Sequence, residues 1–222
     1  MSDLLFKLKD FNVSYRNLTA LRDINVEINK GEKIAFIGPS GGGKTTLLKS
    51  LFNQLPDECS FIHQDYALVE QLSVYNNVYS GKLNEHSNWE NLKNLFSPNK
   101  HCLKTIIPIL EKIGINDKVD DKVGELSGGQ KQRTAIARSL YQNKSIILAD
   151  EPVSSVDPHK AEKLLQEIIK SADTVIFSLH NIELAKKYSS RLIGILNGSI
   201  QFDKSINDVS EQDLLTLYNP LK

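Results

Sequence analysis

The segment 38–45 constrains this chain more than any other part of its sequence. It reads Gly-Pro-Ser-Gly-Gly-Gly-Lys-Thr, which fits G-x-x-x-x-G-K-[ST], and it lies between the apolar run 34–37 and a helix predicted over 45–52. Glycines let backbone amides approach phosphate oxygens, and the following helix presents its N-terminal amides and positive dipole end to the anion. The pattern predicts that Lys44 contacts the β- and γ-phosphates of a nucleotide and that the Thr45 hydroxyl binds Mg²⁺. The phosphate-binding residues predicted from it are Gly38, Pro39, Ser40, Gly41, Gly42, Gly43, Lys44, Thr45 and Thr46.

A second apolar strand, predicted over 145–149, is followed directly by Asp150 and Glu151. Taken alone, the two acids could as well form a solvated strand edge or a helix cap as a functional site. Beside a phosphate-binding loop they predict hydrolytic chemistry. We expect Asp150 to meet Mg²⁺ through water, and Glu151 to orient and deprotonate the attacking water.

Strands alternate with helices along the chain, which predicts an α/β fold with a mainly parallel sheet. The alternation of apolar and polar residues over 4–30 predicts two or three strands, and Asn197-Gly198 predicts a hairpin turn into 199–202. Residues 76–101 are rich in asparagine and serine and are interpreted as a polar insertion leading into helices. Further strands are predicted over 174–179 and 191–196, and further helices over 102–113, with an interruption at Pro108, and over 130–141, 159–170 and 181–188.

Length and composition indicate one large globular unit. The chain has 222 residues, 40% of them hydrophobic, and equal numbers of basic and acidic residues, 27 each. This balance does not favour a general binder of nucleic acid or anionic membranes. No segment contains the roughly 18 apolar residues that a membrane helix needs, so a soluble protein is expected, with any membrane role through a partner. Cys59 and Cys102 are interpreted as reduced thiols and Trp89 as a packing residue.

The pentapeptide Leu-Ser-Gly-Gly-Gln at 126–130 precedes the helix 130–141. Ser127 can cap this helix, and Gly128 and Gly129 leave its first amides open to an anion. As a local feature this is only a helix start. The pentapeptide is, however, the signature of the ABC-type ATPases, and its place between the phosphate loop and the acidic strand end is also theirs. The chain therefore resembles ABC-type ATPases over nearly its whole length.

The resemblance implies a P-loop NTPase (RecA-like) core with an N-terminal antiparallel β part and an inserted helical signature subdomain. A single ABC ATPase domain, 1–222, would consist of a nucleotide-binding core, 1–77 plus 144–222, and a helical subdomain, 78–143. In this family ATP is held between the phosphate loop of one subunit and the signature of another. A head-to-tail homodimer with two ATP sites is expected. The signature residues that would face the partner's ATP are Ser127, Gly128, Gly129 and Gln130.

Four further positions match the family's functional residues. Gln64 resembles the glutamine that contacts Mg²⁺ and the lytic water, and His180 the switch histidine at the γ-phosphate. Asp157 ends a segment, 154–157, that resembles the loop communicating across the dimer, with valine where leucine is usual. Tyr15 resembles the aromatic residue that stacks on adenine. The interval from Lys44 to Gln64 is shorter than usual, and 55–59 is expected to form a tight turn in place of a hairpin.

One phosphate loop, one signature and no heptad segment resemble a stand-alone importer subunit. Residues 64–78, 94–98 and 148–158 resemble those of phosphonate and phosphite importer ATPases. The resemblance implies ATP and Mg²⁺ as cofactors, a membrane permease bound near 64–79, an external solute-binding protein, no nucleic acid, and a place on the cytoplasmic face of the membrane. An ABC ATPase of another small-solute importer, of a lipoprotein-release or division-type complex, or of a non-transport system remains an alternative.

Overall fold

The computed structural model describes residues 3–16 and 18–218. They form two compact units, each of which is described by itself. The first contains the described parts of 1–61, 145–151 and 172–222, and the second contains 62–144 and 152–171. The helical insertion expected over 78–143 falls within the second unit. Its division from a functional core at these boundaries stays a prediction.

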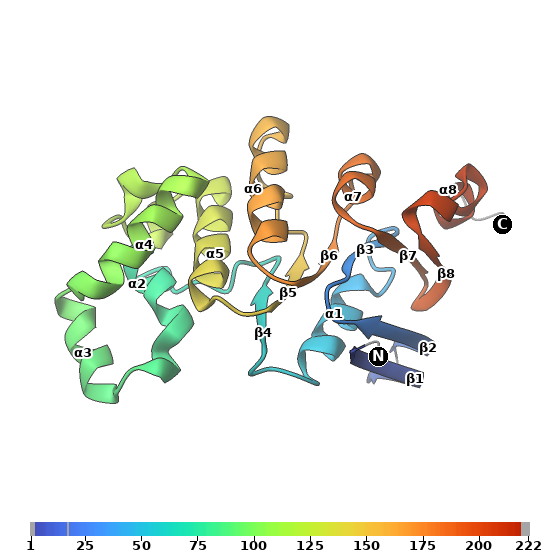
Figure 1. Cartoon of the computed structure of the whole chain (residues 1–222), viewed down its shortest axis with the longest axis horizontal. Coiled ribbons are helices and arrows are strands. Elements are labelled where there is room, and N and C mark those ends of the chain that lie inside the picture. The colour runs from blue at the N-terminus through green and yellow to red at the C-terminus, as the bar shows by residue number, and fades with distance from the viewer. Residues whose placement is uncertain (1–2, 17, 219–222) are drawn as a thin grey trace. The chain divides into compact units, whose positions relative to one another are not determined.

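A mainly parallel sheet forms the centre of the first unit (Figure 1). Strand β3 (Lys33–Ile37) lies between β6 (Thr174–Ser178) and β7 (Arg191–Leu196) and runs parallel to both, and β5 (Ile146–Asp150) runs parallel to β6. The short apolar runs of these strands are buried, as in parallel sheets generally. The order of the sheet is β4 (Cys59–Ile62), β5, β6, β3, β7 and β8 (Ser199–Ser205), with β8 antiparallel to β7.

The N-terminal residues form a separate antiparallel sheet of two strands, β1 (Leu4–Tyr15) and β2 (Leu18–Asn29). Their alternating residues Phe6, Leu8, Val26 and Ile28 are buried and share one core with Leu47 and other residues of helix α1 (Lys44–Phe52). The predicted combination of a mainly parallel sheet and an antiparallel N-terminal part is confirmed.

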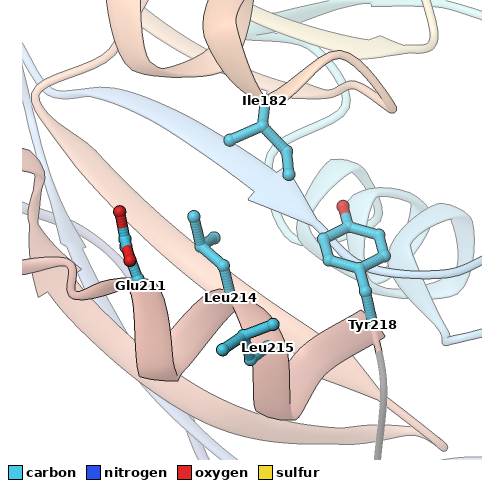
Figure 2. A pocket seen from close by; sticks show the side chains of 5 residues that line it. All are labelled: Ile182, Glu211, Leu214, Leu215 and Tyr218. Atoms are coloured by element: carbon cyan, nitrogen blue, oxygen red, sulfur yellow. The ribbon is translucent and has the colours of Figure 1, made fainter.

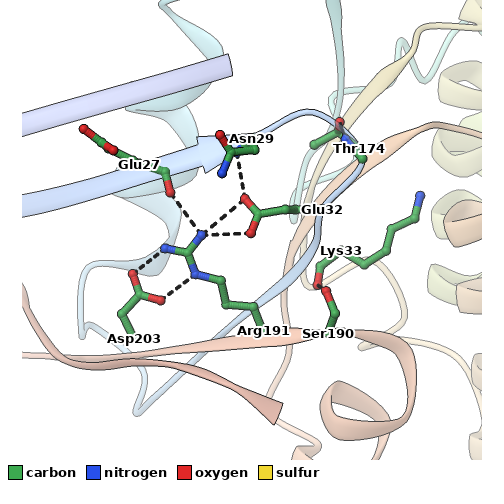
Figure 3. Close-up of polar contacts among 9 residues, drawn as sticks. Glu27, Asn29, Glu32, Lys33, Thr174, Ser190, Arg191 and Asp203 are labelled. Atoms are coloured by element: carbon green, nitrogen blue, oxygen red, sulfur yellow. Dashed lines mark hydrogen bonds and ion pairs between the residues drawn. The ribbon is translucent and has the colours of Figure 1, made fainter. Parts of the chain in front are cut away.

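Arg191 joins separate parts of the first unit through one guanidinium group (Figure 3). Its Nε lies 2.6 Å from Asp203 Oδ1 on β8, and its Nη1 lies 3.0 Å from Glu32 Oε1 in the turn before β3. Nη1 also donates to the Glu27 carbonyl of β2 at 3.0 Å. The Asp203 hydrogen bonds raise the pKa of Arg191 further above its already high value. A planar fork of donors therefore ties the antiparallel sheet to the last two strands of the parallel sheet.

Two further helices belong to the first unit, α7 (Ile182–Tyr188) and α8 (Glu211–Tyr218). The Asn181 side chain caps α7 by accepting a hydrogen bond from the Leu184 amide. The sequence analysis predicted α7 but not α8.

The second unit is helical. Pro108 lies within α4 (Lys100–Ile113), and the predicted interruption there is wrong, because the helix continues through it. Proline removes one N–H from a helix, and Pro108 is exposed, so water can satisfy the carbonyl left without a donor. The other helices described in this unit are α2 (Val74–Tyr79), α3 (Asn88–Phe96), α5 (Gly128–Gln142) and α6 (Pro158–Lys170). A 3₁₀ segment at Ser80–Glu85 lies between α2 and α3, and two more, at Asn116–Lys118 and Val123–Glu125, lie between α4 and α5.

The polar segment 76–101 is more ordered than its composition indicated. Ser87 and Glu90 form a reciprocal cap that starts α3. The buried Asn94 accepts a hydrogen bond from the Tyr75 hydroxyl at 2.6 Å. Trp89 is 74% exposed on α3, so its interpretation as a packing residue is wrong.

The segment 55–59 forms the expected tight turn. The Leu55 carbonyl accepts hydrogen bonds from the Glu58 and Cys59 amides, both at 3.2 Å, and β4 begins at Cys59. Both cysteines are buried. Within the described ranges, no helix has the length and apolar character needed to cross a bilayer.

Candidate functional site

The phosphate-binding loop connects β3 to α1 and rests against β7. A β-carbon at Gly38, whose φ is 141°, would lie 2.0 Å from the Ile195 carbonyl oxygen, and one at Gly42 would lie 2.9 Å from the same atom. The Gly198 amide donates to the Gly42 carbonyl at 2.9 Å. Glycine is therefore required at positions 38 and 42, because the backbone of β7 lies directly behind the loop there.

Lys44 is folded back onto the loop that it follows. Its Nζ donates to the Gly38 carbonyl at 2.7 Å and to the Pro39 carbonyl at 3.0 Å. Burial lowers the pKa of Lys44, while the nearby Glu151 and Asp150 act in the opposite direction. No side chain of the described residues caps α1, so its first amides remain oriented for an anion.

Asp150 lies at the carboxyl end of β5 with its carboxylate buried. Oδ2 accepts a hydrogen bond from Thr45 Oγ1 at 2.7 Å, and Oδ1 accepts one from Ser178 Oγ at 2.7 Å. Both predicted metal ligands of this unit are thus in direct contact. A hydroxyl and a carboxylate oxygen beside a phosphate-binding loop are the hard ligands that Mg²⁺ prefers, so these residues fit the ion.

Ser178 is the functional neighbour that the sequence analysis missed. Its Oγ donates to Asp150 and accepts a hydrogen bond from the Glu151 amide at 2.9 Å. The parallel register of β5 and β6 places Ser178 opposite Asp150. The available signal was a serine at the carboxyl end of a strand whose other residues are mostly apolar.

Glu151 and His180 follow neighbouring strands and meet beyond the ends of those strands. His180 Nε2 lies 2.7 Å from Glu151 Oε1. Glu151 has a φ of 48°, which is uncommon for a residue with a side chain and holds its backbone in a sharp turn directly after β5. Two of the three predicted catalytic residues are therefore brought together.

The signature lies in the second unit, at the start of α5. Ser127 Oγ accepts a hydrogen bond from the Gln130 amide at 3.4 Å, and Gln130 Oε1 accepts one from the Ser127 amide at 2.9 Å. The predicted cap is confirmed. A β-carbon at Gly129 would lie 3.0 Å from the Ser155 carbonyl oxygen, and one at Gly128 would lie 3.6 Å from Tyr66 Oη. Segment 154–157 and the signature thus lie side by side.

The other predicted residues have definite local positions. Asp157 caps α6, because its Oδ1 accepts a hydrogen bond from the Lys160 amide at 3.1 Å. Gln64 is exposed in the turn after β4, and Tyr15 is an exposed residue at the end of β1. The roles of Asp157, Gln64 and Tyr15 toward nucleotide, metal or a partner stay predictions.

The family model described as ABC transporter matches residues 21–154. The chain belongs to the ABC transporter family. It is 36% identical to the Phosphonates import ATP-binding protein PhnC of Lactobacillus acidophilus, covering 97% of this chain and 95% of that protein. It is also 36% identical to the protein of the same name from Staphylococcus haemolyticus, covering 98% and 95% of the two chains.

Solved ABC transporter cassettes share its fold. The dimeric cassette MJ0796 superposes with a TM-score of 0.74 at 26% identity, covering 90% of this chain and 98% of that one. A dimeric post-hydrolysis state of MJ0796 bound to ADP and Pi gives a TM-score of 0.72 with the same identity and coverage. The predicted ABC-type ATPase, its P-loop NTPase fold and its use of ATP are confirmed.

Proposed function

We propose that this chain is the ATP-hydrolysing subunit of an ABC importer for phosphonate or a related phosphorus anion such as phosphite. The ATPase is supported by the contact of Thr45, Ser178 and Asp150 beside the phosphate-binding loop. The solute is supported by similarity, over nearly the full length of both chains, to proteins named as phosphonate import ATP-binding proteins. The choice of solute is carried by the similarity to these named proteins and not by the fold.

In the proposed mechanism, Lys44 exchanges the Gly38 and Pro39 carbonyls for phosphate oxygens of ATP, while the first amides of α1 surround the phosphate chain. Thr45 and Asp150 would hold Mg²⁺, with Gln64 as a further ligand. When bound, the ion neutralises negative charge on the β- and γ-phosphates. Tyr15 would stack on adenine, which contributes on the order of 1 kcal/mol.

Glu151 is the proposed general base. It accepts a proton from the attacking water. Its carboxylate is held by His180, and its backbone amide donates a hydrogen bond to the Ser178 hydroxyl. His180 would also reach the γ-phosphate. Because these groups are fixed before the reaction, little reorganisation is required of them during it.

The working unit is proposed to be a head-to-tail homodimer. The related MJ0796 cassette is described as dimeric. The signature residues 127–130 and Asp157 both belong to the second unit, and they are proposed to complete the ATP site of the partner subunit. Membrane permease subunits bound near 64–79, an external solute-binding protein, and a place at the cytoplasmic face of the membrane follow from the importer proposal. Nucleic acid has no part in it.

The deciding experiment is growth of a strain lacking the gene on phosphonate, phosphite or phosphate as the sole phosphorus source. Loss of growth on phosphonate or phosphite alone, restored by the intact gene, supports the proposal. Normal growth on all three contradicts the solute and leaves another small-solute importer or a lipoprotein-release or division-type complex. Copurification with ribosomes or nucleic acid, without a multi-spanning membrane protein, favours a non-transport ABC ATPase.

A further inference from the structure

The hydroxyl of Tyr218, at the end of α8, contacts the first residue of the phosphate-binding loop. The Gly38 amide donates to Tyr218 Oη at 3.1 Å, across 180 positions of sequence. The carbonyl of the same glycine accepts from Lys44 Nζ at 2.7 Å. Gly38 is therefore held at both of its polar groups, by Tyr218 and by Lys44.

Helix α8 is anchored at its other end as well. Asp213 Oδ2 accepts hydrogen bonds from the Ser210 amide and from Lys204 Nζ, both at 2.8 Å, and Lys204 belongs to β8. The hydrogen bond from Lys204 is the largest cause and that from the Ser210 amide the next, and they lower the pKa of the Asp213 carboxyl to about 2. Leu217, next to Tyr218, is fully buried. The helix is thus fixed to the sheet before it delivers the tyrosine.

The Tyr218 ring lines an open pocket of the first unit. The pocket, of about 390 Å³, lies between the ring, Ile182 of α7, and Leu214 and Leu215 of α8 (Figure 2). Its walls are mostly apolar, with Glu211 as the one charged residue among the described residues that line it, and the ring forms one of the walls. Because the pocket leaves space beside the ring, the hydrogen bond to Gly38 is the directional contact that fixes the hydroxyl.

We propose that Tyr218 is a positioning residue for ATP binding. Its hydroxyl accepts from the amide of the peptide that joins β3 to the loop, and this fixes the direction in which the loop leaves the strand. A side chain behind Gly38 cannot do this, because the Ile195 carbonyl occupies that space. Without the hydroxyl, the loop samples other orientations. ATP binding must then order the loop, which lowers the net affinity for ATP. The chemical step is unaffected, because Tyr218 contacts neither Asp150 nor Glu151 in the described structure.

Tyr218→Phe in the full chain tests the proposal, with Tyr79→Phe as the matched control. Tyr79 also loses one hydroxyl hydrogen bond, from its Oη to Asn91 Oδ1 at 2.9 Å, but it lies in the helical unit. We expect the Kd for ADP and the KM for ATP to rise about threefold to tenfold in Tyr218→Phe, with kcat within about twofold, and no change in the control. An unchanged KM, equal shifts in both variants, or a fall in kcat alone overturns the proposal.

Hydrogen exchange on the unmodified protein gives a second test that requires no variant. The Gly38 amide is expected to exchange as slowly as the amides of β3. Exchange as fast as that of the exposed Ser40 shows that the bond to Tyr218 is not maintained in solution and overturns the proposal. Both tests read the nucleotide site, so they are independent of whether the solute is a phosphonate.

Discussion

His180 Nε2 lies 2.7 Å from Glu151 Oε1. The strands that precede these two residues end at Ser178 and Asp150, which are 28 positions apart in the sequence. His180 follows β6 and Glu151 follows β5, and these two strands are neighbours in the sheet. This contact lets His180 hold the carboxylate of the proposed base in place before a nucleotide binds. The two residues are expected to act as one unit.

Glu151→Gln is expected to lower kcat by on the order of 10²- to 10⁴-fold, because an amide cannot accept the proton of the attacking water. ATP-dependent dimers should then accumulate. Phosphate release measures kcat, and size-exclusion chromatography with light scattering measures the fraction of dimer. Glu111→Gln, at an exposed position of α4, is the matched control and should behave as the unmodified protein. Unchanged turnover in Glu151→Gln would refute the assignment of the base.

The direct contact also predicts non-additive kinetics. If His180 acts by holding Glu151, the double variant His180→Ala/Glu151→Gln should be scarcely slower than Glu151→Gln alone. Effects on kcat that multiply in the double variant would mean that His180 acts independently of Glu151.

Lys44→Ala should weaken ATP binding by roughly 10- to 100-fold, because a buried charge that contacts the phosphates is lost. Titration calorimetry measures the change. Lys49→Ala, on the exposed face of the same helix, removes an equal charge and should leave the affinity nearly unchanged. Equal affinity losses in both variants would point to a general charge effect in place of a specific contact.

Ser178→Ala should impair both folding and catalysis. It leaves the Glu151 amide without its acceptor and the Asp150 carboxylate without one donor, at a cost of about 1–3 kcal/mol in the free energy of unfolding. The displaced base should lower kcat by roughly 10- to 100-fold. Ser189→Ala is the control, since its Oγ donates, among the described residues, to the helix carbonyl of Ala185. A Ser178→Ala protein with normal kcat would show that the bridge is structural only.

Arg191→Lys should destabilise the protein by about 1–3 kcal/mol, because an ammonium cannot satisfy Asp203, Glu32 and the Glu27 carbonyl together. Lys7→Met breaks an ion pair with Glu27 in which both side chains are 56% exposed, and it should cost at most about 1 kcal/mol. Urea unfolding of the two variants measures the difference. Similar midpoints would mean that the fork geometry of Arg191 adds nothing.

The parts predicted from sequence are those in which the chemistry is local. The loop 38–45, the cap Ser127 with Gln130, and the acidic strand end 150–151 each lie within a few residues. The contacts of Ser178 and Tyr218 are different, because each depends on which strand or helix comes to lie beside another. No spacing along the chain encodes the 180 positions between Tyr218 and Gly38.

Polar residues with structural roles explain the other misses. Asn94 and Tyr75 form a buried hydrogen bond that helps to fix α3, and an asparagine-rich segment gives no apolar periodicity to read. Trp89 shows the opposite case, since a large aromatic side chain is by itself a signal for burial and this one faces solvent. In both cases the side chain's partners, and not its type, determine its place.

The 2.0 Å between a β-carbon at position 38 and the Ile195 carbonyl has a consequence for directed evolution of this loop. Any residue other than glycine there displaces strand β7, so the substitution removes the folded protein before it can alter affinity for a ligand. A randomised library of 38–45 should therefore return glycine at position 38 whether clones are selected for nucleotide binding or only for solubility. Enrichment at that position reports a requirement of the fold, and only the remaining loop positions report selection for the phosphate.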